Sequence, residues 1–504
     1  MDVASVVKLL LLGIPVVLLI HSQFSKHSLR SIPTVGGSSI PVLSYIKSFR
    51  WLHHAKEVLQ EGYDKYKGAT FKMAMPDRWL VVVSGHKLVE EVATLPSDIA
   101  SFTYASGELV GTRYIFGEEV HRDPFHVAML KGQLTRNIGG LHEILHAETA
   151  MAIEDLIPIE ADEWVPVNAF LLTQKAIARI TGRLLVGPTL CNDPEYLDLV
   201  VNFTRDVGVA RFFLSIFPPV LKPLAAKFIT NISDRAKRGT KIMGSLIEER
   251  LALFDKPDTE DSDRPADMLQ WVIEMARPRG YQVPQIVRLV LLLNFASIFT
   301  TGTSLTHLLY HLAAEPKYVR MLREEIEPVI QSEGFTKASL AKLRKLDSFM
   351  RETARYNGAN IEAVSVSRMF YKDYTLSDGT FIPAGNIVVT PVLPTHMDPE
   401  NYENPRVFDP LRFVKLQEDD PSVAQATTLQ YVTTTSDFYS FGHGKSACPG
   451  RFFAINEMKD FIVFILLNYD LKFENEGVVP PPVYRGSVII PNPSATVLFR
   501  KRQT

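Results

Sequence analysis

The chain has 504 residues, 46% hydrophobic and 22% charged, so it is long and apolar enough to bury a large core. Its 54 basic and 56 acidic side chains give a net charge of −2, which excludes a nucleic-acid-binding protein that depends on overall basicity. Cys191 and Cys448 are the only cysteines, which excludes a disulfide scaffold and a cysteine-rich zinc module and favours a reducing compartment.

The first predicted element is an apolar segment at residues 3–20, interrupted by Lys8. A membrane-spanning helix needs ~20 mostly apolar residues, with a lower limit of ~17, so this segment is a short single-pass anchor. The competing hypothesis is a cleaved signal peptide, but Asp2 stands where a basic residue is expected and no small-x-small cleavage site follows. Lys26 and Arg30 come after the apolar run, so the positive-inside rule leaves the rest of the chain in the cytosol.

The remainder contains no internal repeat and no low-complexity linker. We therefore expect an anchor at 1–21, a basic linker with Pro and Gly at 22–37, and one large domain at 38–504. Apolar residues at helical spacing predict helices at 55–67, 134–156, 236–254, 284–314, 318–331, 339–357 and 451–468. Strand-like runs are few, at 79–84, 374–376 and 387–390. The predicted fold class is mainly α with a minor β-sheet, preceded by one N-terminal transmembrane helix.

The apolar stretch at 212–224 is unusual, because Pro218, Pro219 and Pro223 predict that no regular helix runs along it. Two interpretations are open. The stretch is either a buried connection or a patch that dips into the same bilayer as the anchor.

Residues 142–146, His-Glu-Ile-Leu-His, match the H-E-x-x-H pattern, in which two histidines on one helix face bind zinc and the glutamate is a general base. Thr149 and Ala152 stand where the extended motif has glycine and histidine, so Glu160 or Glu163 would have to supply the third ligand. Two polar histidines on a surface helix are the simpler interpretation, and a zinc peptidase is kept as a remote alternative.

A second pattern surrounds Cys448, which is bracketed by Gly442, Gly444 and Gly450 and followed by a predicted helix. Glycines permit tight turns and close backbone approach, so amide hydrogens can point at the sulfur. Together with the positive helix N-terminus, these donors stabilise a thiolate. A lone thiolate in such a loop suits one soft metal centre, foremost the iron of a haem.

This stretch resembles the haem-binding loop of the cytochrome P450 family, F-x-x-G-x-[RH]-x-C-x-G, with Phe441, Gly444, Cys448 and Gly450 at its fixed positions. The resemblance implies that these residues bind haem b and that Cys448 is the axial ligand of the iron. Ser446 is the one mismatch, because the family places Arg or His there against a haem propionate. Lys445, Arg113 and Lys131 are the candidates to compensate.

Further family motifs follow in the expected order. Glu352 and Arg355 match the E-x-x-R pair, and Arg412 in the stretch 408–413 resembles the arginine that completes the structural triad. Leu411 replaces the usual acidic residue of that stretch. Arg368 matches the family's arginine that reaches a haem propionate.

The segment 296–301 resembles the oxygen-activation motif, [AG]-G-x-[DE]-T-[TS], with Thr300 and Thr301 as the implied catalytic residues. The family uses the first threonine to hydrogen-bond dioxygen and the acid to relay protons. Ser297 replaces the glycine and Phe299 replaces the acid. Ordered water held by Thr300 and Thr301 would therefore have to relay the protons. Alternatively, the two threonines only hydrogen-bond their own helix.

The resemblance spans about residues 33–502 and implies a haem-thiolate monooxygenase that hydroxylates or epoxidises a hydrophobic small molecule with O2. Its electrons would come from NADPH through a membrane-bound NADPH–cytochrome P450 reductase, at the endoplasmic reticulum membrane. The closing Gly-Arg-Phe-Phe-Ala is most similar to fungal members that oxidise terpenoid or alkaloid intermediates of secondary metabolism. The expected cavity walls are 102–116, 295–304, 361–366 and 486–490.

Two alternative functions also involve a bound haem. One is a haem-thiolate isomerase or dehydratase that needs no reductase; the presence of Thr300 argues against it, and Phe299 leaves it open. The other is a non-enzymatic haem carrier.

Overall fold

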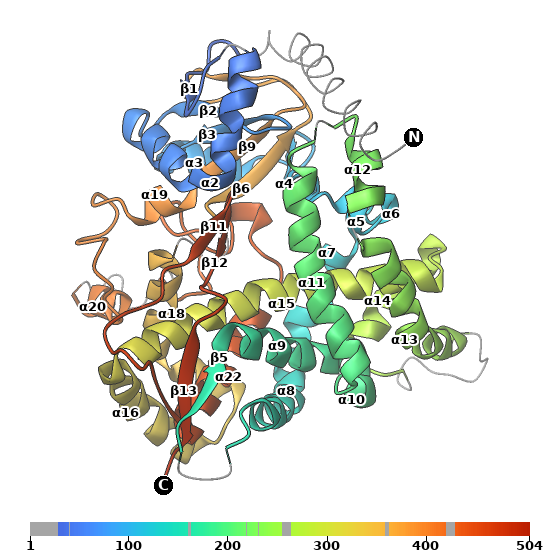
Figure 1. Cartoon of the computed structure of the whole chain (residues 1–504), viewed down its shortest axis with the longest axis vertical. Helices are drawn as coiled ribbons and strands as arrows, with labels where there is room; N and C mark the ends of the chain where they lie inside the picture. The colour runs from blue at the N-terminus through green and yellow to red at the C-terminus, as the bar shows by residue number, and fades with distance from the viewer. Residues whose placement is uncertain are drawn as a thin grey trace.

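A computed structural model describes residues 29–39, 41–159, 163–217, 219–229, 231–254, 264–357, 362–419 and 429–503. The predicted anchor at 3–20 lies outside these residues, as does Glu160. Helices make up most of the described chain, and four small sheets lie among them (Figure 1). The prediction of a mainly helical chain with minor sheet content is confirmed, whereas the N-terminal transmembrane helix stays a prediction.

The helices are α2 (Pro41–Lys65), α3 (His86–Thr94), α4 (Phe102–Val110), α5 (Thr112–Ile115), α6 (Glu118–Arg122), α7 (His126–Met129), α8 (Thr135–Leu156), α9 (Ala169–Leu185), α10 (Gly187–Leu190), α11 (Pro194–Leu214), α12 (Lys222–Ile229), α13 (Ile232–Ala252), α14 (Met268–Ala276), α15 (Val283–Ala314), α16 (Pro316–Glu333), α17 (Lys337–Lys342), α18 (Arg344–Tyr356), α19 (Val392–His396), α20 (Arg412–Asp419) and α22 (Arg451–Asn468). The strands are β1 (Thr34–Val35), β2 (Thr70–Ala74), β3 (Trp79–Val83), β4 (Ala100–Ser101), β5 (Val165–Asn168), β6 (Val364–Phe370), β7 (Tyr374–Thr375), β8 (Phe381–Ile382), β9 (Ile387–Pro391), β10 (Tyr469–Lys472), β11 (Val483–Arg485), β12 (Val488–Ile490) and β13 (Thr496–Lys501).

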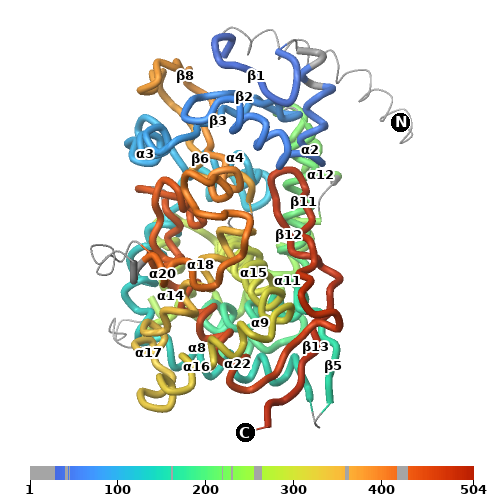
Figure 2. The backbone as a smooth tube through the Cα atoms, turned by 90° about the vertical axis from the view of Figure 1, so that its left-hand side faces the viewer, coloured from blue at the N-terminus to red at the C-terminus, as the bar shows by residue number. Residues whose placement is uncertain are grey.

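The largest sheet has the order β1-β2-β3-β9-β6-β4 and lies with α2 and α3 at one end of the molecule (Figures 1 and 2). Strands β1–β2 and β3–β9 are parallel pairs, and the other neighbours are antiparallel. Strand β6 is irregular between Ser365 and Arg368, where Val366 has a φ of 46°. A positive φ is strained for a β-branched residue, so the surrounding structure must hold this bulge in place.

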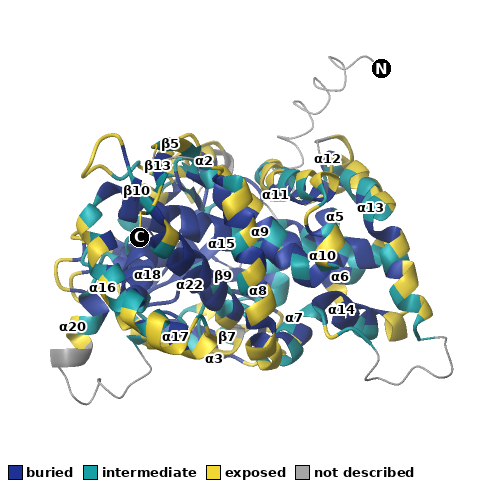
Figure 3. Cartoon of the chain, turned by 90° about the horizontal axis from the view of Figure 1, so that it is seen from below, coloured by how far each residue is buried: buried dark blue, intermediate teal, exposed yellow. Residues whose placement is uncertain are grey.

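Helix α15 runs through the centre of the molecule and is buried over most of its length (Figures 1 and 3). It is apolar on all sides because it packs against α9, α11 and α13 and also contacts α22. Among the described helices it is the one whose length and composition would suffice to cross a membrane. The apolar composition of α15 is explained by its burial in the core of the molecule.

Several predicted elements differ in detail from the structure. The predicted helix at 339–357 is two helices, α17 and α18, because Leu343 between them is not helical. The helix predicted at 55–67 begins earlier, at Pro41, and has a kink at His54. Helices α9 and α11 were not predicted.

The stretch 212–224 also differs from its prediction. Helix α11 continues to Leu214, and α12 begins at Lys222 with Pro223 in its first turn, where a proline removes no helical hydrogen bond. Within this stretch Phe213, Val220 and Leu224 are 40%, 72% and 50% exposed, so the interpretation as a buried connection is wrong.

Candidate functional site

One large cavity of about 1450 Å³ contains the sulfur-bearing residue Cys448 in its wall. All four segments predicted as cavity walls contribute lining residues. These are Phe102, Ser106, Leu109 and Val110; Phe295, Ala296, Phe299, Thr300, Thr301 and Ser304; Glu362, Val364, Ser365 and Val366; and Gly486, Ser487, Val488 and Ile490. Most of these side chains are apolar, so the cavity suits a hydrophobic guest.

Helices α9 and α11 supply further lining residues that the sequence analysis missed, including Gln174, Arg211 and Phe212. The apolar side chains of α11 at positions 199, 203, 207, 210 and 214 are spaced by three or four residues and are buried. This spacing was the signal that could have identified α11 as a core helix beside the cavity.

The loop that carries Cys448 is fixed by its backbone. The Cys448 amide donates to the Phe441 carbonyl at 2.7 Å, which closes the loop just before α22. Gly442 and Gly444 have φ values of 70° and 65°. A Cβ on Gly444 would lie 2.5 Å from the Ala93 carbonyl oxygen, so only glycine fits against α3 there.

Burial raises the pKa of the Cys448 thiol above its ordinary value. The backbone amides of Gly450 and Arg451, together with the Arg451 charge, act in the opposite direction. Burial dominates, so the thiol keeps its proton until a cation compensates the buried charge. A coordinating metal ion does this, since it deprotonates the thiol that binds it.

Helix α15 presents the predicted catalytic residues to the same cavity. Thr300 and Thr301 both line it, and the Thr300 hydroxyl donates to the Ala296 carbonyl at 2.7 Å. Phe299 also lines the cavity and stacks on Phe295 with 6.0 Å between ring centroids. An aromatic pair therefore occupies the cavity wall where the family motif has an acid.

Ser297 is absent from the cavity lining and contacts α9. Its hydroxyl lies 2.7 Å from that of Thr181, which in turn donates to Glu457 on α22 at 3.2 Å. Glu457 is buried, and burial raises its pKa to about 8. Sequence reasoning missed Thr181 and Glu457, because the hydrogen bonds from Ser297 to Thr181 and from Thr181 to Glu457 join three helices that are distant in sequence.

Arg368 is buried beside the cysteine loop, outside the cavity lining. Its guanidinium donates to the carbonyls of Val92, at 3.0 Å, and Ala93. Ala93 is also the residue that packs on Gly444. The structure thus places Arg368 where it holds the end of α3 against the loop, and its role toward a propionate stays a prediction.

Of the residues considered as substitutes for the arginine or histidine missing at Ser446, Lys131 lies at the loop. Its Nζ donates to the Lys445 carbonyl at 3.2 Å. Arg113 forms an ion pair with Glu118 at 2.7 Å.

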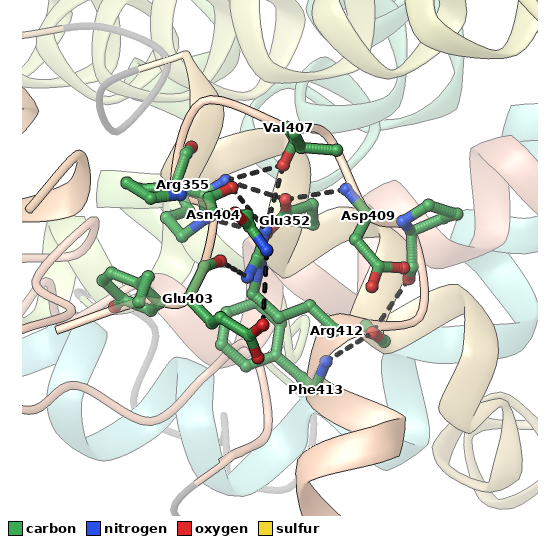
Figure 4. Close-up of polar contacts among 12 residues, drawn as sticks. Glu352, Arg355, Glu403, Asn404, Val407, Asp409, Arg412 and Phe413 are labelled. Atoms are coloured by element: carbon green, nitrogen blue, oxygen red, sulfur yellow. Dashed lines mark hydrogen bonds and ion pairs between the residues drawn. The ribbon is translucent and has the colours of Figure 1, made fainter. Parts of the chain in front are cut away.

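The predicted triad residues meet in the interior (Figure 4). Arg355 donates to both oxygens of Glu352, at 2.7 and 2.8 Å, and Arg412 donates to Glu352 at 3.0 Å. The two arginines also bind backbone carbonyls at the end of α19 and in the loop between α19 and α20. These carbonyls belong to His396, Glu403, Asn404, Pro405 and Val407. The triad therefore fixes the chain that leads toward the cysteine loop.

The H-E-x-x-H histidines pack against α22. His142 Nδ1 contacts the Asn456 amide at 3.2 Å, and His146 Nδ1 contacts Asp460 at 3.0 Å. In the described part of the chain no three His, Cys, Asp or Glu side chains gather to hold a metal ion, which does not support the zinc-peptidase alternative.

The cavity fits a haem on two grounds. Its volume exceeds the ~300–1,000 Å³ of an ordinary ligand pocket, so there is room for a planar cofactor together with a guest. Its wall joins a single thiol, held by backbone groups, to apolar side chains such as Phe441 and Ala454. A soft sulfur ligand in an apolar pocket is the donor set of a haem-thiolate iron.

The cytochrome P450 family model matches residues 35–499. Among curated proteins, cytochrome P450 monooxygenase 103 of Postia placenta is 43% identical over 94% of this chain and 94% of its own length. Cytochrome P450 monooxygenase 151 of the same fungus is 41% identical over 96% and 97%. Cytochrome P450 monooxygenase CYP512U6 of Ganoderma lucidum is 34% identical over 94% and 92%.

Proposed function

Because the chain belongs to the cytochrome P450 family, and is thus a haem b monooxygenase that uses O2, a redox partner and a hydrophobic substrate, we propose a more specific activity for it. It hydroxylates or epoxidises a terpenoid or alkaloid intermediate of fungal secondary metabolism. Its electrons come from NADPH through a membrane-bound cytochrome P450 reductase. The fungal origin of the similar monooxygenases supports the biological setting.

The observation that carries this proposal is the continuous cavity between Cys448 and the apolar walls. Haem b, when bound, would supply the activation of O2: with two electrons from one NADPH and two protons, one oxygen atom enters the substrate and the other leaves as water. Cys448 would hold the haem iron through its sulfur and would donate electron density to it. Phe295 and Phe299 keep bulk water away from the guest.

Thr300 is the residue on α15 that we propose for proton handling. Its Oγ1 donates to the Ala296 carbonyl and keeps lone pairs that accept a hydrogen bond from water in the cavity. A water held there delivers protons without the acidic side chain that Phe299 replaces.

We also propose that the protein is anchored in the endoplasmic reticulum membrane by residues 1–21, with 22–37 as a linker and the catalytic domain at 38–504 in the cytosol. The exposed side chains of Val220, Leu224 and Phe228 support a second contact with the same bilayer.

The test combines a spectrum with turnover. Wild-type protein reduced under carbon monoxide gives the red-shifted Soret band of a thiolate-ligated haem, and Cys448→Ala loses that band or fails to take up haem. An unchanged spectrum in the variant contradicts the ligand assignment. The substrate class is then screened by spin-state shifts with terpenoids and alkaloids.

The alternative activity, a haem-thiolate isomerase or dehydratase, predicts turnover of a peroxide substrate without NADPH or reductase. Phe299 in the acid position is the observation that keeps this alternative open. The proposed monooxygenase requires both NADPH and reductase, so omitting each in turn separates the two activities. A haem carrier turns over neither substrate.

A further inference from the structure

An ion pair lies in the wall of the cavity, at the end of α11. Arg211, near the end of α11, binds Glu362 Oε1 through Nη1, and the Ser487 hydroxyl donates to Glu362 Oε2 at 2.9 Å. All three residues line the cavity, and the two ionic side chains are 19% and 21% exposed. Both Glu362 oxygens are thus engaged, whereas Arg211 uses one of its five N–H donors in this pair.

A second arginine lies on the same side of this wall. Arg485 in β11 is paired directly with Val488 in β12, and Val488 is also bridged to Glu362. Residues directly opposite one another in antiparallel pairs point to the same face, so Arg485, Val488 and Glu362 share a face. Figure 2 shows this hairpin beside α2.

Arg485 also lines the cavity, and its guanidinium has no ion pair or side-chain hydrogen bond with the part of the chain that the structure describes. The cavity lining as a whole has an excess of positive charge. It contains five cations, Lys175, Arg179, Arg205, Arg211 and Arg485, and three acids, Asp155, Asp198 and Glu362.

The three acids are already paired. Asp155 binds Arg179 at 2.5 Å, Asp198 binds Arg238 at 2.7 Å, and Glu362 binds Arg211. An amine substrate would therefore meet like charges with no free carboxylate to receive it. A carboxylate would meet guanidinium groups, whose planar donors match its two oxygens.

We propose that Arg211 and Arg485 form a carboxylate-binding subsite, and that the substrate is an apolar molecule bearing one carboxylate. This inference rests on the proposed function and narrows it, since it selects terpenoid acids over alkaloid amines. Arg211 and Arg485 hold the carboxylate and so determine which part of the apolar skeleton reaches the haem side of the cavity. Glu362 positions Arg211. Because its carboxylate competes with the substrate carboxylate for the Arg211 guanidinium, it also limits the affinity of the subsite for an anion.

The experiment uses the full-length, haem-loaded protein in phosphatidylcholine nanodiscs, with abietic acid and its methyl ester as probes. Affinity is measured at pH 7.5 by equilibrium dialysis and by the spin-state shift. We expect wild-type protein to bind the acid at least about tenfold more tightly than the ester, because only the acid forms charge-assisted hydrogen bonds. Arg211→Gln and Arg485→Gln each remove most of this preference and leave ester binding unchanged.

Glu362→Gln separates an anion subsite from a purely structural ion pair. In a subsite, this variant frees Arg211 and increases affinity for the acid, so it acts in the opposite direction to Arg211→Gln. If the ion pair only holds α11 against the hairpin, Arg211→Gln and Glu362→Gln both alter acid and ester binding in the same direction. That second pattern overturns the proposal, as does equal binding of the two probes to the wild-type protein.

Arg235→Gln is the matched control. Arg235 has similar exposure, 21%, and binds Asp206 of α11 at 2.9 Å, but it does not line the cavity. It should leave the ratio of acid to ester affinity unchanged, and an effect as large as that of Arg211→Gln contradicts the subsite. The carbon monoxide spectrum is recorded for every variant. A normal spectrum without acid preference rejects the subsite alone, whereas a missing thiolate band rejects the proposed function.

Discussion

At the scale of single residues, Phe299 is the side chain of α15 whose chemistry differs most from the family motif, because an aromatic ring replaces an acid. It places an aromatic ring on the cavity face of α15, while Ser297 contacts Thr181 of α9. No carboxylate is therefore contributed by the motif segment 296–301 itself. Thr300 is left as the residue of that segment that lines the cavity and has a hydroxyl with a defined hydrogen bond.

Thr300→Ala removes this hydroxyl and should uncouple NADPH oxidation from product formation. We expect product per NADPH to fall by about tenfold or more, with hydrogen peroxide released instead, because proton delivery by a positioned group contributes at least that much. The measurement is the ratio of product and peroxide to NADPH consumed. Thr303→Ala is the control, since Thr303 is a buried α15 residue outside the cavity lining, with no partner for its hydroxyl among the described residues. Equal coupling in both variants would remove Thr300 from the mechanism.

Glu457 gives a pH-dependent prediction. Burial raises its pKa from 4.5 to about 8; the Thr181 hydrogen bond opposes this rise and the Asp460 charge adds to it. Between these two pKa values the folded protein keeps a proton that the unfolded chain has released. The free energy of unfolding therefore falls as pH rises through this window, by up to ~1.4 kcal/mol per pH unit.

Glu457→Gln cannot release a proton and should flatten this dependence. The melting temperatures of wild type and variant are compared at pH 5.5 and 7.5, where we expect the variant to lose less stability at the higher pH. Glu474→Gln, at an exposed position, should keep the wild-type dependence. Parallel pH profiles for all three proteins would show that Glu457 is not neutral in the folded state.

At the scale of elements, the triad joins α18 to the loop before α20. Glu352 and Arg355 are fully buried, and Arg412 nearly so. Removing one partner leaves an uncompensated buried charge, which typically costs about 3–5 kcal/mol. We expect Arg412→Ala to lower the free energy of unfolding by about this amount, measured by denaturant titration. Lys415→Ala, which breaks an exposed pair with Asp409 at 2.7 Å, should cost at most about 1 kcal/mol. Equal effects would show that the triad adds no more stability than an exposed ion pair.

Helices with apolar side chains along their whole length could be predicted from the sequence. Features that depend on contacts between residues distant in sequence could not. The bounds of α22 match the prediction, and α15 differs by one residue, because apolar side chains mark both along their whole length. Helices α9 and α11 were missed, although their apolar faces are buried. Leu343 divides α17 from α18 within one continuous helical pattern. The residues of the cysteine loop are neighbours in sequence, so the loop could be predicted. Arg211 and Glu362 are 151 residues apart, so their contact could not.

At the scale of the whole molecule, elements from the entire chain enclose the cavity. Its walls combine α4, α11 and α15 with strand β6 and the β11–β12 hairpin. Helix α12 is the next helix after α11 in the chain; Val220 in the turn before α12, and Leu224 and Phe228 within it, are exposed. Exposed apolar side chains on α12 and the turn before it, next to the cavity helix α11, have the character of a membrane-contacting surface.

This surface should bind a bilayer even without the predicted anchor. We expect a chain lacking residues 1–28 to float with liposomes, and the same chain with Val220, Leu224 and Phe228 changed to Ser to remain in the soluble fraction. Burying each large apolar side chain contributes about 1.5–3 kcal/mol, so three together are enough to control partitioning. Val407→Ser with Val478→Ser is the control, because these side chains are 60% and 62% exposed and lie on other elements. If the control releases the protein as fully as the α12 substitutions do, general surface hydrophobicity and not this helix accounts for membrane binding.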